Sequence, residues 1–284
     1  LTKSTEWRMI WLIKSTFYAM NAPLPLAATA PSLAIERIRH PLQGRHLQVV
    51  RRTQVSPGFV RLTLAGPELA GCVSAGFDDH LKLILPAPGQ DRPTLPTLQD
   101  GRPVFDGPRP TLRDYTPARF DAAAGELDIE VVLHDAGPAT QWAEQATPGQ
   151  QIGVGGPRGS MVIPMAFDGY LLVGDDTALP AIARRLAELP ADAPVVVLAE
   201  VDSPADELVF DTAANVQLTW VHRRGAAPGT TTLLLDAIQT LALPAGDFHA
   251  WVACETGAAK ALRAHLVAER GARPEWTKAA GYWR

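Results

Sequence analysis

The chain has 284 residues, of which 46% are hydrophobic and 20% charged, a composition typical of soluble proteins with room for two domains. A formal net charge of −4 gives no general attraction to nucleic acid or to anionic membranes. The two cysteines, Cys72 and Cys254, are far apart and lack the spacing of metal ligands. We therefore expect no disulfide framework, no metal site and a reducing, cytoplasmic location.

The beginning of the chain differs from the rest. The stretch "WRMIWLIKSTFYAM" is apolar, but Arg8 and Lys14 interrupt it, and it is too short and too charged to span a bilayer. The Ala- and Pro-rich residues that follow resemble a signal-peptide cleavage region only loosely. We expect residues 1–37 to be a disordered extension outside the fold, with translation normally starting at Met20.

Residues 38–165 show the alternating pattern of β-strands. Apolar and polar residues alternate in "FVRLTLAG" and "HLKLIL", and "LQVVRRT" and "ELDIEVVLH" have the same character. Residues 86–110 form a long Pro- and Gly-rich stretch without periodicity, which indicates a loop. No long helical pattern occurs before "GPATQWAEQA". This part of the chain predicts an antiparallel six-stranded Greek-key β-barrel.

Residues 166–284 alternate between strands and helices. Strands are expected at residues 170–174, 194–201, 216–222 and 249–254, and the clearest helices at 177–189, 231–241 and 256–270. The strands are almost continuously apolar, which is typical of a parallel sheet covered on both faces. We therefore expect a nucleotide-binding α/β domain after the barrel.

The stretch "RDYTPARF" combines three useful groups in a barrel strand. Arg113 and Tyr115 are expected on one face of the strand, and Asp114 and Thr116 on the other. A guanidinium, an aromatic ring and a hydroxyl this close together can neutralise a phosphate, stack on a planar cofactor and hydrogen-bond its ring. The plain alternative is a strand end with exposed charges.

A second stretch, "HDAGPATQWAEQA", runs from a strand end into a helix. Gly137 and Pro138 open that helix and Thr140 lies in its first turn, so free N–H groups and a hydroxyl suit a pyrophosphate. His134 could serve as a base, but no nucleophile elbow accompanies it. Trp142 is expected in the core, with or without a role in the site.

The stretch "GDDTALPAIARRL" follows the first strand of the α/β half. Such a turn usually holds a phosphate, yet Asp175 and Asp176 would repel one. Both carboxylates can instead cap the following helix, where negative charge is favoured.

Six ordered motifs carry a resemblance to a known family. "RDYTPARF", "HDAGPATQWA", "GPRGS", "GDDTALPAIARRL", "ACE" and the terminal "GYWR" resemble the motifs of siderophore-interacting proteins, which are FAD-dependent ferric-siderophore reductases within the ferredoxin–NADP reductase superfamily. The resemblance covers residues 38–284. The chain departs from the usual pattern at Ala118, at Thr140, at Asp176 and in ending directly after Arg284.

The resemblance implies an oxidoreductase that passes electrons from NAD(P)H through FAD to chelated Fe(III) and releases Fe(II). Its substrate would be a ferric siderophore or another ferric chelate. By the same resemblance, Arg113, Tyr115 and Thr116 hold the flavin ring and its phosphate. The FAD diphosphate and adenosine would lie along His134, Gly137, Pro138, Ala139 and Thr140. The nicotinamide would face Gly174, Asp175, Asp176, Thr177 and Glu255.

Basic groups near the flavin are expected to recruit the acceptor, because ferric chelates are frequently anionic. Lys278 and Arg284, which bracket Tyr282 and Trp283, are the candidates, with Arg158 as a third. The plain alternative is ordinary solvated charge.

Two pairs of residues in the α/β half bear on the choice of electron donor. Glu200 and Asp202 follow the second α/β strand, where a carboxylate favours the free ribose hydroxyl of NADH. Arg223 and Arg224 follow the next strand and favour the 2′-phosphate of NADPH. We favour NADPH on these paired arginines, and a ferredoxin-type donor stays open.

Two other functions fit the same residues. The chain could be a general flavin reductase or a reductase module that serves another protein, since it has no cysteine cluster for its own iron–sulfur centre. It could also be a flavin-free binding protein on the same fold.

Overall fold

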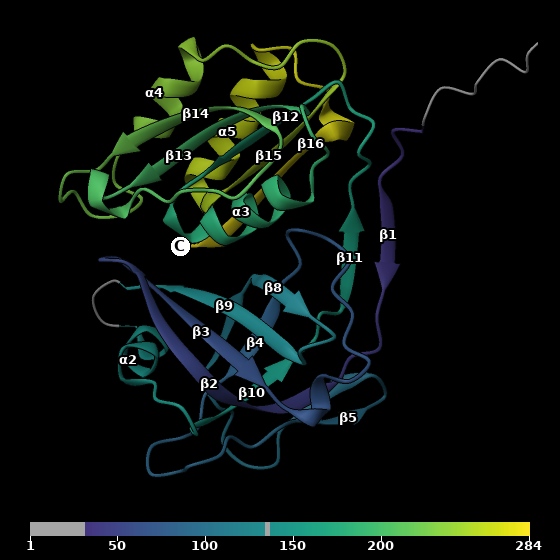
Figure 1. The fold of residues 1–284 in the computed structure, drawn as a ribbon, viewed down its shortest axis with the longest axis vertical. Helices are drawn as coiled ribbons and strands as arrows, with labels where there is room; N and C mark the ends of the chain where they lie inside the picture. Colours follow the sequence, from purple (N-terminus) through teal and green to yellow (C-terminus); the bar gives the residue numbers. More distant parts are fainter. Residues whose placement is uncertain (1–31, 134–136) are drawn as a thin grey trace, which may run out of the picture. The chain divides into compact units, whose positions relative to one another are not determined.

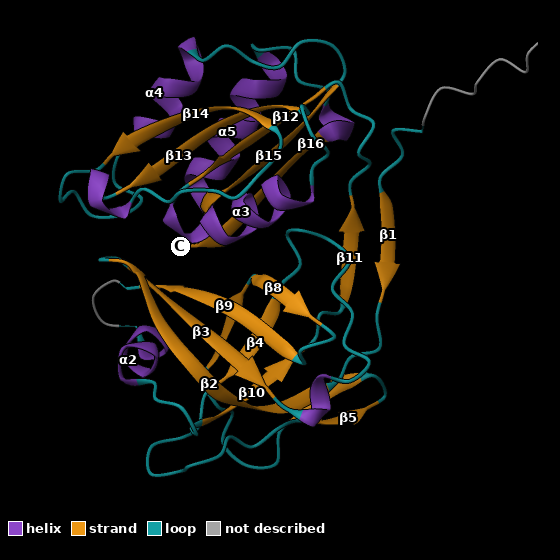
Figure 2. Ribbon diagram, in the orientation of Figure 1, coloured by secondary structure: helices purple, strands orange, loops and turns teal. Residues whose placement is uncertain are grey.

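Two large β-sheets carry the fold in the computed structural model, which describes residues 32–133 and 137–284 (Figure 1). The first is antiparallel and the second parallel, and each comes from one half of the chain (Figure 2). Residues 33–284 belong to one compact unit. The domain boundaries expected near residues 37 and 165 stay a prediction, and residues 1–31 lie outside the described part.

The antiparallel sheet has seven strands and is strongly curled (Figure 2). They are β2 (Gly44–Ser56), β3 (Phe59–Ala65), β4 (Leu81–Ile84), β7 (Leu112–Tyr115), β8 (Pro117–Asp121), β9 (Glu126–Val132) and β10 (Gln151–Gly155). Neighbouring strands follow the order β7-β4-β10-β2-β3-β9-β8.

The predicted six-stranded Greek-key barrel is not confirmed in that form. "RDYTPARF" divides into β7 and β8 at Thr116, and these two strands are the opposite edges of the curled sheet. Pro117 begins β8, and a proline has no N–H with which to continue a ladder. The sheet is therefore an open half-barrel whose two edges meet along the chain at Thr116.

Alternation in the sequence does predict the core of this sheet. Every second residue of β3 and β4 is buried as expected: Val60, Leu62, Leu64, Leu81 and Leu83. Helix α2 (Pro138–Gln145) packs against β9 and β3. Trp142 on this helix contacts the same core, as predicted.

Two small sheets and one short helix complete this half. β1 (Glu36–Arg39) pairs with β11 (Gly159–Val162), so an ordered strand overlaps the last two residues of the segment expected as an extension. β5 (Thr97–Gln99) and β6 (Arg102–Val104) form a hairpin inside the stretch expected as a plain loop. A single 3₁₀ turn, η1 (Pro67–Leu69), follows β3.

The parallel sheet has five strands in the order β14-β13-β12-β15-β16. They are β12 (Gly169–Gly174), β13 (Pro194–Val201), β14 (Asn215–His222), β15 (Phe248–Glu255) and β16 (Thr277–Trp283). The first four match the predicted strands. β16 was not predicted, because "TKAAGYW" contains a lysine and a glycine and lacks a continuous apolar run.

Helices cover both faces of the parallel sheet, as predicted (Figure 1). They are α3 (Leu179–Glu188), α4 (Leu233–Thr240) and α5 (Thr256–Ala268), with short 3₁₀ turns η2 (Asp176–Ala178), η3 (Pro204–Asp206) and η4 (Pro274–Trp276). Leu172 of β12 packs in one core with Ile182 of α3, and Val173 packs in the other with Ile238 and Leu262. Successive residues of the strand thus enter different cores.

The order of the strands indicates which end of this sheet a ligand would use. β13 and β14 lie on one side of β12, and β15 and β16 on the other, so the order reverses beside β12. The carboxyl ends of strands at such a reversal are the usual ligand site of open α/β sheets. Within the described part of the chain, no helix is long and apolar enough to cross a membrane.

Candidate functional site

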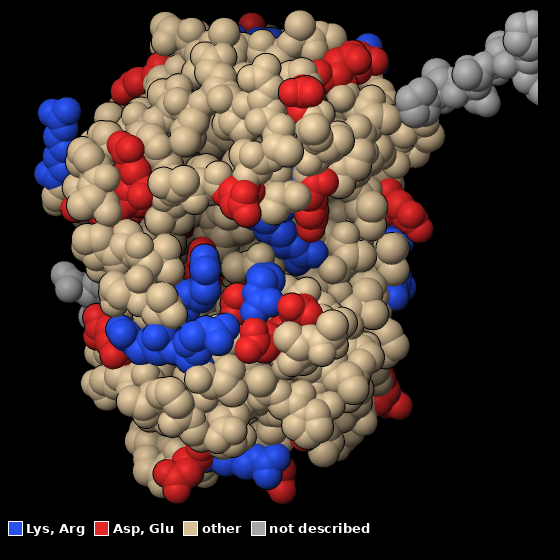
Figure 3. Space-filling model, in the orientation of Figure 1, with Lys and Arg blue, Asp and Glu red and all other residues tan. Residues whose placement is uncertain are grey.

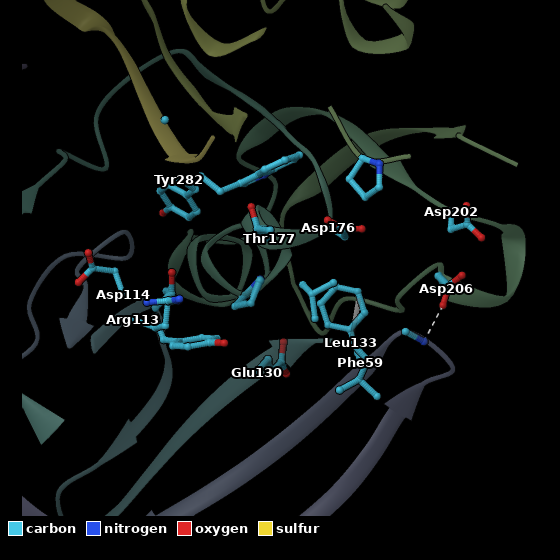
Figure 4. Close-up of a pocket in the computed structure, with 18 of the residues that line it drawn as sticks. Phe59, Arg113, Asp114, Glu130, Leu133, Asp176, Thr177, Asp202, Asp206 and Tyr282 are labelled. Carbon is cyan, nitrogen blue, oxygen red and sulfur yellow. Dashed lines mark hydrogen bonds between the residues drawn. The ribbon is translucent and has the colours of Figure 1, made fainter. Parts of the chain in front are cut away.

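A cleft of about 1390 Å³ is lined by residues of both halves (Figure 4). Its size exceeds the roughly 300–1,000 Å³ of most small-molecule sites, so it has room for an extended ligand. The antiparallel sheet contributes Phe59, Arg113, Asp114, Tyr115, Thr116, Glu130 and Leu133. The α/β half contributes Asp176, Thr177, Asp202, Asp206, Arg223, Lys278, Tyr282, Trp283 and Arg284.

The four residues of "RDYT" all lie at this cleft. Burial raises the pKa of Tyr115 to about 12, so its phenol is neutral at physiological pH. Arg113 is exposed and donates to the carbonyl oxygen of Leu112 at 2.8 Å, whereas Asp114 pairs with Lys82 at 2.7 Å. Thr116 is buried between β7 and β8. The structure thus brings a neutral ring, a hydroxyl and an exposed guanidinium together, as the sequence predicts.

The residues expected along a diphosphate lie beside the end of β9 but outside the lining of this cleft, so their role stays a prediction. Gly137 precedes helix α2, Pro138 is its first residue, and Ala139 and Thr140 are buried. The Thr140 hydroxyl donates to the carbonyl oxygen of Val132 at 3.4 Å. None of these four residues belongs to the cleft lining in the described part of the chain. His134 is outside the described residues.

The two adjacent carboxylates of the "GDDT" turn have different partners. Asp175 caps η2 and accepts from the backbone N–H of Thr177 at 3.0 Å, so the predicted cap is confirmed for this residue. Asp176 accepts from Arg223 Nη2 at 2.6 Å. Burial and the neighbouring Asp176 raise the pKa of Asp175 to about 7. At Gly174 a Cβ would lie 2.3 Å from that of Ala178, so only glycine fits this turn.

Arg223 is held inside the α/β half rather than presented to solvent. It is 8% exposed, and its second guanidinium nitrogen lies 3.5 Å from Glu200 Oε1. The positive charge expected to meet a 2′-phosphate is therefore already balanced by Asp176 and Glu200. Arg224 is exposed, with a φ of 53° in the turn after β14.

Strand β16 brings the terminal motif to the cleft. Lys278 pairs with the buried carboxylate of Asp78, which also accepts from Trp251 Nε1 at 2.9 Å. Arg284 is exposed at the cleft. Trp283 Nε1 donates to Asp175 Oδ2 at 2.8 Å. Of the expected acceptor-recruiting charges at the cleft, Lys278 thus has an internal partner.

Other expected site residues also lie outside the cleft lining, namely Arg158, Gly174, Asp175, Arg224 and Glu255. Arg158 is exposed in the loop before β11. Glu255 caps α5 and accepts from the backbone N–H groups of Gly257 and Ala258, which lower its pKa. Its cap needs only a carboxylate at the end of β15, so its role toward a nicotinamide stays a prediction.

The sequence did not single out the cleft carboxylates Asp78, Glu130 and Asp206. Asp78 is buried beneath Lys278, and Glu130 accepts from Arg61 Nε at 2.9 Å on β9. A pair of aspartates between Phe77 and the strand of Leu81 was a usable signal for Asp78, because carboxylates are rarely buried without a partner. Glu130 gave no comparable signal, since alternation places it on the face of β9 away from the barrel core.

Charges on the surface are mixed. On the face drawn in Figure 3, Lys and Arg side chains gather near the middle, with Asp and Glu side chains beside them. In the antiparallel sheet, Arg119 of β8 pairs with Asp121, Glu126 and Asp128 at 2.5–3.0 Å. The charge of Arg119 is therefore balanced by carboxylates of its own sheet.

Comparison with known families decides the relationship. Residues 48–161 match the "Siderophore-interacting FAD-binding domain" and residues 167–284 match the "Siderophore-interacting protein" family. The chain belongs to the siderophore-interacting protein family. The predicted resemblance is thereby confirmed over nearly all of the described residues.

Relatives of this family share most of their length with the chain. The NADPH-dependent ferric-chelate reductase of Escherichia coli is 35% identical over 252 residues, 87% of this chain and 96% of the relative. The ferric vibriobactin reductase ViuB of Vibrio cholerae is 31% identical over 245 residues, 84% of this chain and 89% of the relative.

Solved structures agree on the fold. A siderophore utilization protein from T. fusca superposes with a TM-score of 0.83 at 43% identity, over 88% of this chain and 96% of that one. The ferredoxin reductase in carbazole 1,9a-dioxygenase has a TM-score of 0.59 at 13% identity, over 84% and 67% of the two chains. The second likeness shows only that the fold is of the ferredoxin-reductase type.

Proposed function

We propose that this protein is a cytoplasmic ferric-siderophore reductase that transfers electrons from NADPH, through FAD, to Fe(III) held in a chelate. The observation that carries the proposal is the shared cleft, where "RDYT" meets the "GDDT" loop and the terminal strand. The family and the names of the E. coli and V. cholerae relatives support the same activity.

The residues at the cleft fit a flavin. Tyr115 offers a neutral aromatic ring, Thr116 a hydroxyl, and Arg113 an exposed guanidinium that pairs with no carboxylate in the described part of the chain. A flavin, when bound, accepts two electrons together and releases them one at a time, which matches a two-electron donor to a one-electron acceptor. The protein's own task is to place the groups and to shape the local charge.

The charges at the cleft divide into paired and unpaired groups. Asp78 balances Lys278, and Asp176 and Glu200 balance Arg223. Arg284 is exposed at the end of β16, so we assign it the larger share in recruiting an anionic chelate.

The direct test is anaerobic stopped-flow reduction of the purified flavoprotein, followed by mixing with ferric chelates of different charge. We expect NADPH to bleach the flavin absorbance faster than NADH or a reduced ferredoxin does, and ferric siderophore to restore it. If the purified protein binds no flavin, it is a flavin-free binding protein and the proposed reductase activity is wrong. Equal turnover with free flavin and with ferric chelates would indicate a general flavin reductase.

A charge-reversal variant tests acceptor recruitment. Arg284→Glu should raise KM for an anionic ferric chelate severalfold at low salt, by less than about 1 kcal/mol, with the effect shrinking as salt is added. Lys278→Glu should perturb the protein more broadly, because it faces Asp78. Equal losses for neutral and anionic chelates in Arg284→Glu would contradict a role in charge recruitment.

A further inference from the structure

Asp175 accepts four hydrogen bonds from the protein itself. Its Oδ1 accepts from the backbone N–H of Thr177 at 3.0 Å and from the Thr177 hydroxyl at 2.5 Å. Its Oδ2 accepts from Trp283 Nε1 at 2.8 Å and from the backbone N–H of Glu255 at 3.2 Å. Asp175 also faces a separate cavity of about 210 Å³ rather than the main cleft. Its carboxylate is therefore committed to internal partners.

Capping alone does not account for a carboxylate at this position. Asp175 is 4% exposed and adjoins Asp176, and both burial and that like charge disfavour its ionised form. A serine or threonine would cap η2 with a neutral hydroxyl at lower cost. A carboxylate differs because its second oxygen remains to accept from the loop of β15 and from Trp283.

Trp283 is fixed at three points. Its indole N–H reaches Asp175, and its carbonyl oxygen accepts from the Thr256 hydroxyl at 2.7 Å. Its ring lies against Gly229, where a Cβ would come within 2.7 Å of the ring atom Cη2. The same residue lines the main cleft beside Tyr282. The position of the Trp283 indole in the cleft lining thus depends on specific contacts and not only on apolar burial.

We propose that Asp175 is a positioning residue, which holds the indole of Trp283 as a fixed wall of the cleft so that the nicotinamide nucleotide binds in a productive orientation. This inference rests on the proposed function. Asp175 acts through Trp283. Its side chain also links the carboxyl ends of β12, β15 and β16, which are neighbours in the sheet but far apart in the sequence.

A double-mutant cycle tests the coupling. Trp283→Phe keeps a ring but removes the N–H, and Asp175→Ser keeps a cap but removes the second oxygen. Each should lower kcat/KM for NADPH about tenfold, and the double variant should fall no further than Asp175→Ser alone, because both changes remove one contact. Strictly additive losses, or full activity in Trp283→Phe, would overturn the proposal.

Two controls separate positioning from general damage. Asp168→Asn alters a carboxylate at the opposite end of β12, where it accepts from the backbone N–H of Asp247 at 2.8 Å, and should leave NADPH oxidation unchanged. Reoxidation of the chemically reduced flavoprotein by ferric chelate should also be unchanged in Trp283→Phe. A variant that loses flavin or slows both half-reactions equally would show a structural defect and contradict positioning.

Hydrogen exchange decides the question independently of catalysis. In protein without nucleotide, amides of residues 279–283 should exchange faster in Asp175→Ser and Trp283→Phe than in the wild type or in Asp168→Asn. Unchanged exchange in both variants would overturn the proposal. If the wild type fails to oxidise NADPH, the proposed function is wrong. The exchange result would still show whether the contact between Asp175 and Trp283 holds the end of β16 in place.

Discussion

The two walls of the cleft are built in different ways. The wall from the antiparallel sheet takes Arg113, Tyr115 and Thr116 from one short stretch, the end of β7 and the residue that follows it, and its arginine is exposed. The wall from the α/β half collects residues from the ends of separate strands, and its main cation, Arg223, is buried between carboxylates. In the first wall the arginine side chain is exposed at the cleft. In the second wall several charged side chains pair with one another inside the protein and hold its loops in place.

The largest expected difference between the walls is in stability. Arg223→Ala removes the buried guanidinium that pairs with the carboxylates of Asp176 and Glu200, which should cost about 3–5 kcal/mol of unfolding free energy. Arg113→Ala removes an exposed side chain and should change stability by less than about 0.5 kcal/mol. Urea denaturation of both apoproteins measures this. Similar values for the two variants would erase the contrast between the walls.

Flavin retention should depend on the first wall. Tyr115→Ala combined with Thr116→Val removes the ring and the hydroxyl and should weaken FAD binding by about 2–3 kcal/mol. The flavin-to-protein ratio after purification and a titration of the apoprotein give the measurement. Tyr115→Phe is the matched control, because it keeps the ring. A double variant that purifies fully loaded with an unchanged flavin spectrum would refute the ring-site assignment.

Acid should destabilise the buried α/β side through His249. Burial, with a smaller contribution from Arg185, lowers the pKa of His249 to about 3, and neither ring nitrogen has a hydrogen-bond partner among the described residues. Between pH 6.5 and pH 3, His249 is therefore protonated in the unfolded chain, where its pKa is near 6.5, but stays neutral in the folded chain. Stability should fall across that window as the pH decreases.

The size of this effect can be isolated by substitution. His249→Phe should reduce the loss of unfolding free energy between pH 7 and pH 5 by about 2 kcal/mol relative to the wild type. Denaturation at the two pH values measures it. The comparison with the wild type is needed because protonation of Asp175 has the opposite effect on stability. Its pKa is raised to about 7, so its contribution stabilises the folded state as the pH falls. Identical pH dependence in both proteins would show that His249 is not responsible.

The smallest effect concerns donor choice. With Arg223 committed to Asp176 and Glu200, we assign contact with the 2′-phosphate of NADPH to Arg224. Arg224→Ala should lower kcat/KM for NADPH about tenfold, or about 1.4 kcal/mol, and leave NADH nearly unchanged. A wild-type enzyme that prefers NADH, or an equal loss with both donors, would shift the ribose contact to Glu200 or Asp202.

Prediction from the sequence was most successful where the signal was local. Alternation in β3 and β4 and the apolar runs of β12, β13 and β15 predicted buried strands in the correct halves. "RDYT" placed four cleft residues together because they are consecutive in the chain. Failures occurred where pairing overrides composition: β16 lacks an apolar run, yet it pairs with β15 at the edge of the sheet.

Sequence by itself determined the family, the two kinds of sheet and the groups along β7, because periodicity and consecutive motifs are properties of the chain. Tertiary structure alone decided which charged side chains are paired inside the protein and which are exposed to a ligand. Arg223, Lys278 and Asp175 read as ordinary site charges in the sequence, but they are paired across 47, 200 and 108 positions with Asp176, Asp78 and Trp283, respectively. Such pairs form because a charge or polar group buried by folding must find a partner, and that partner is chosen by the fold.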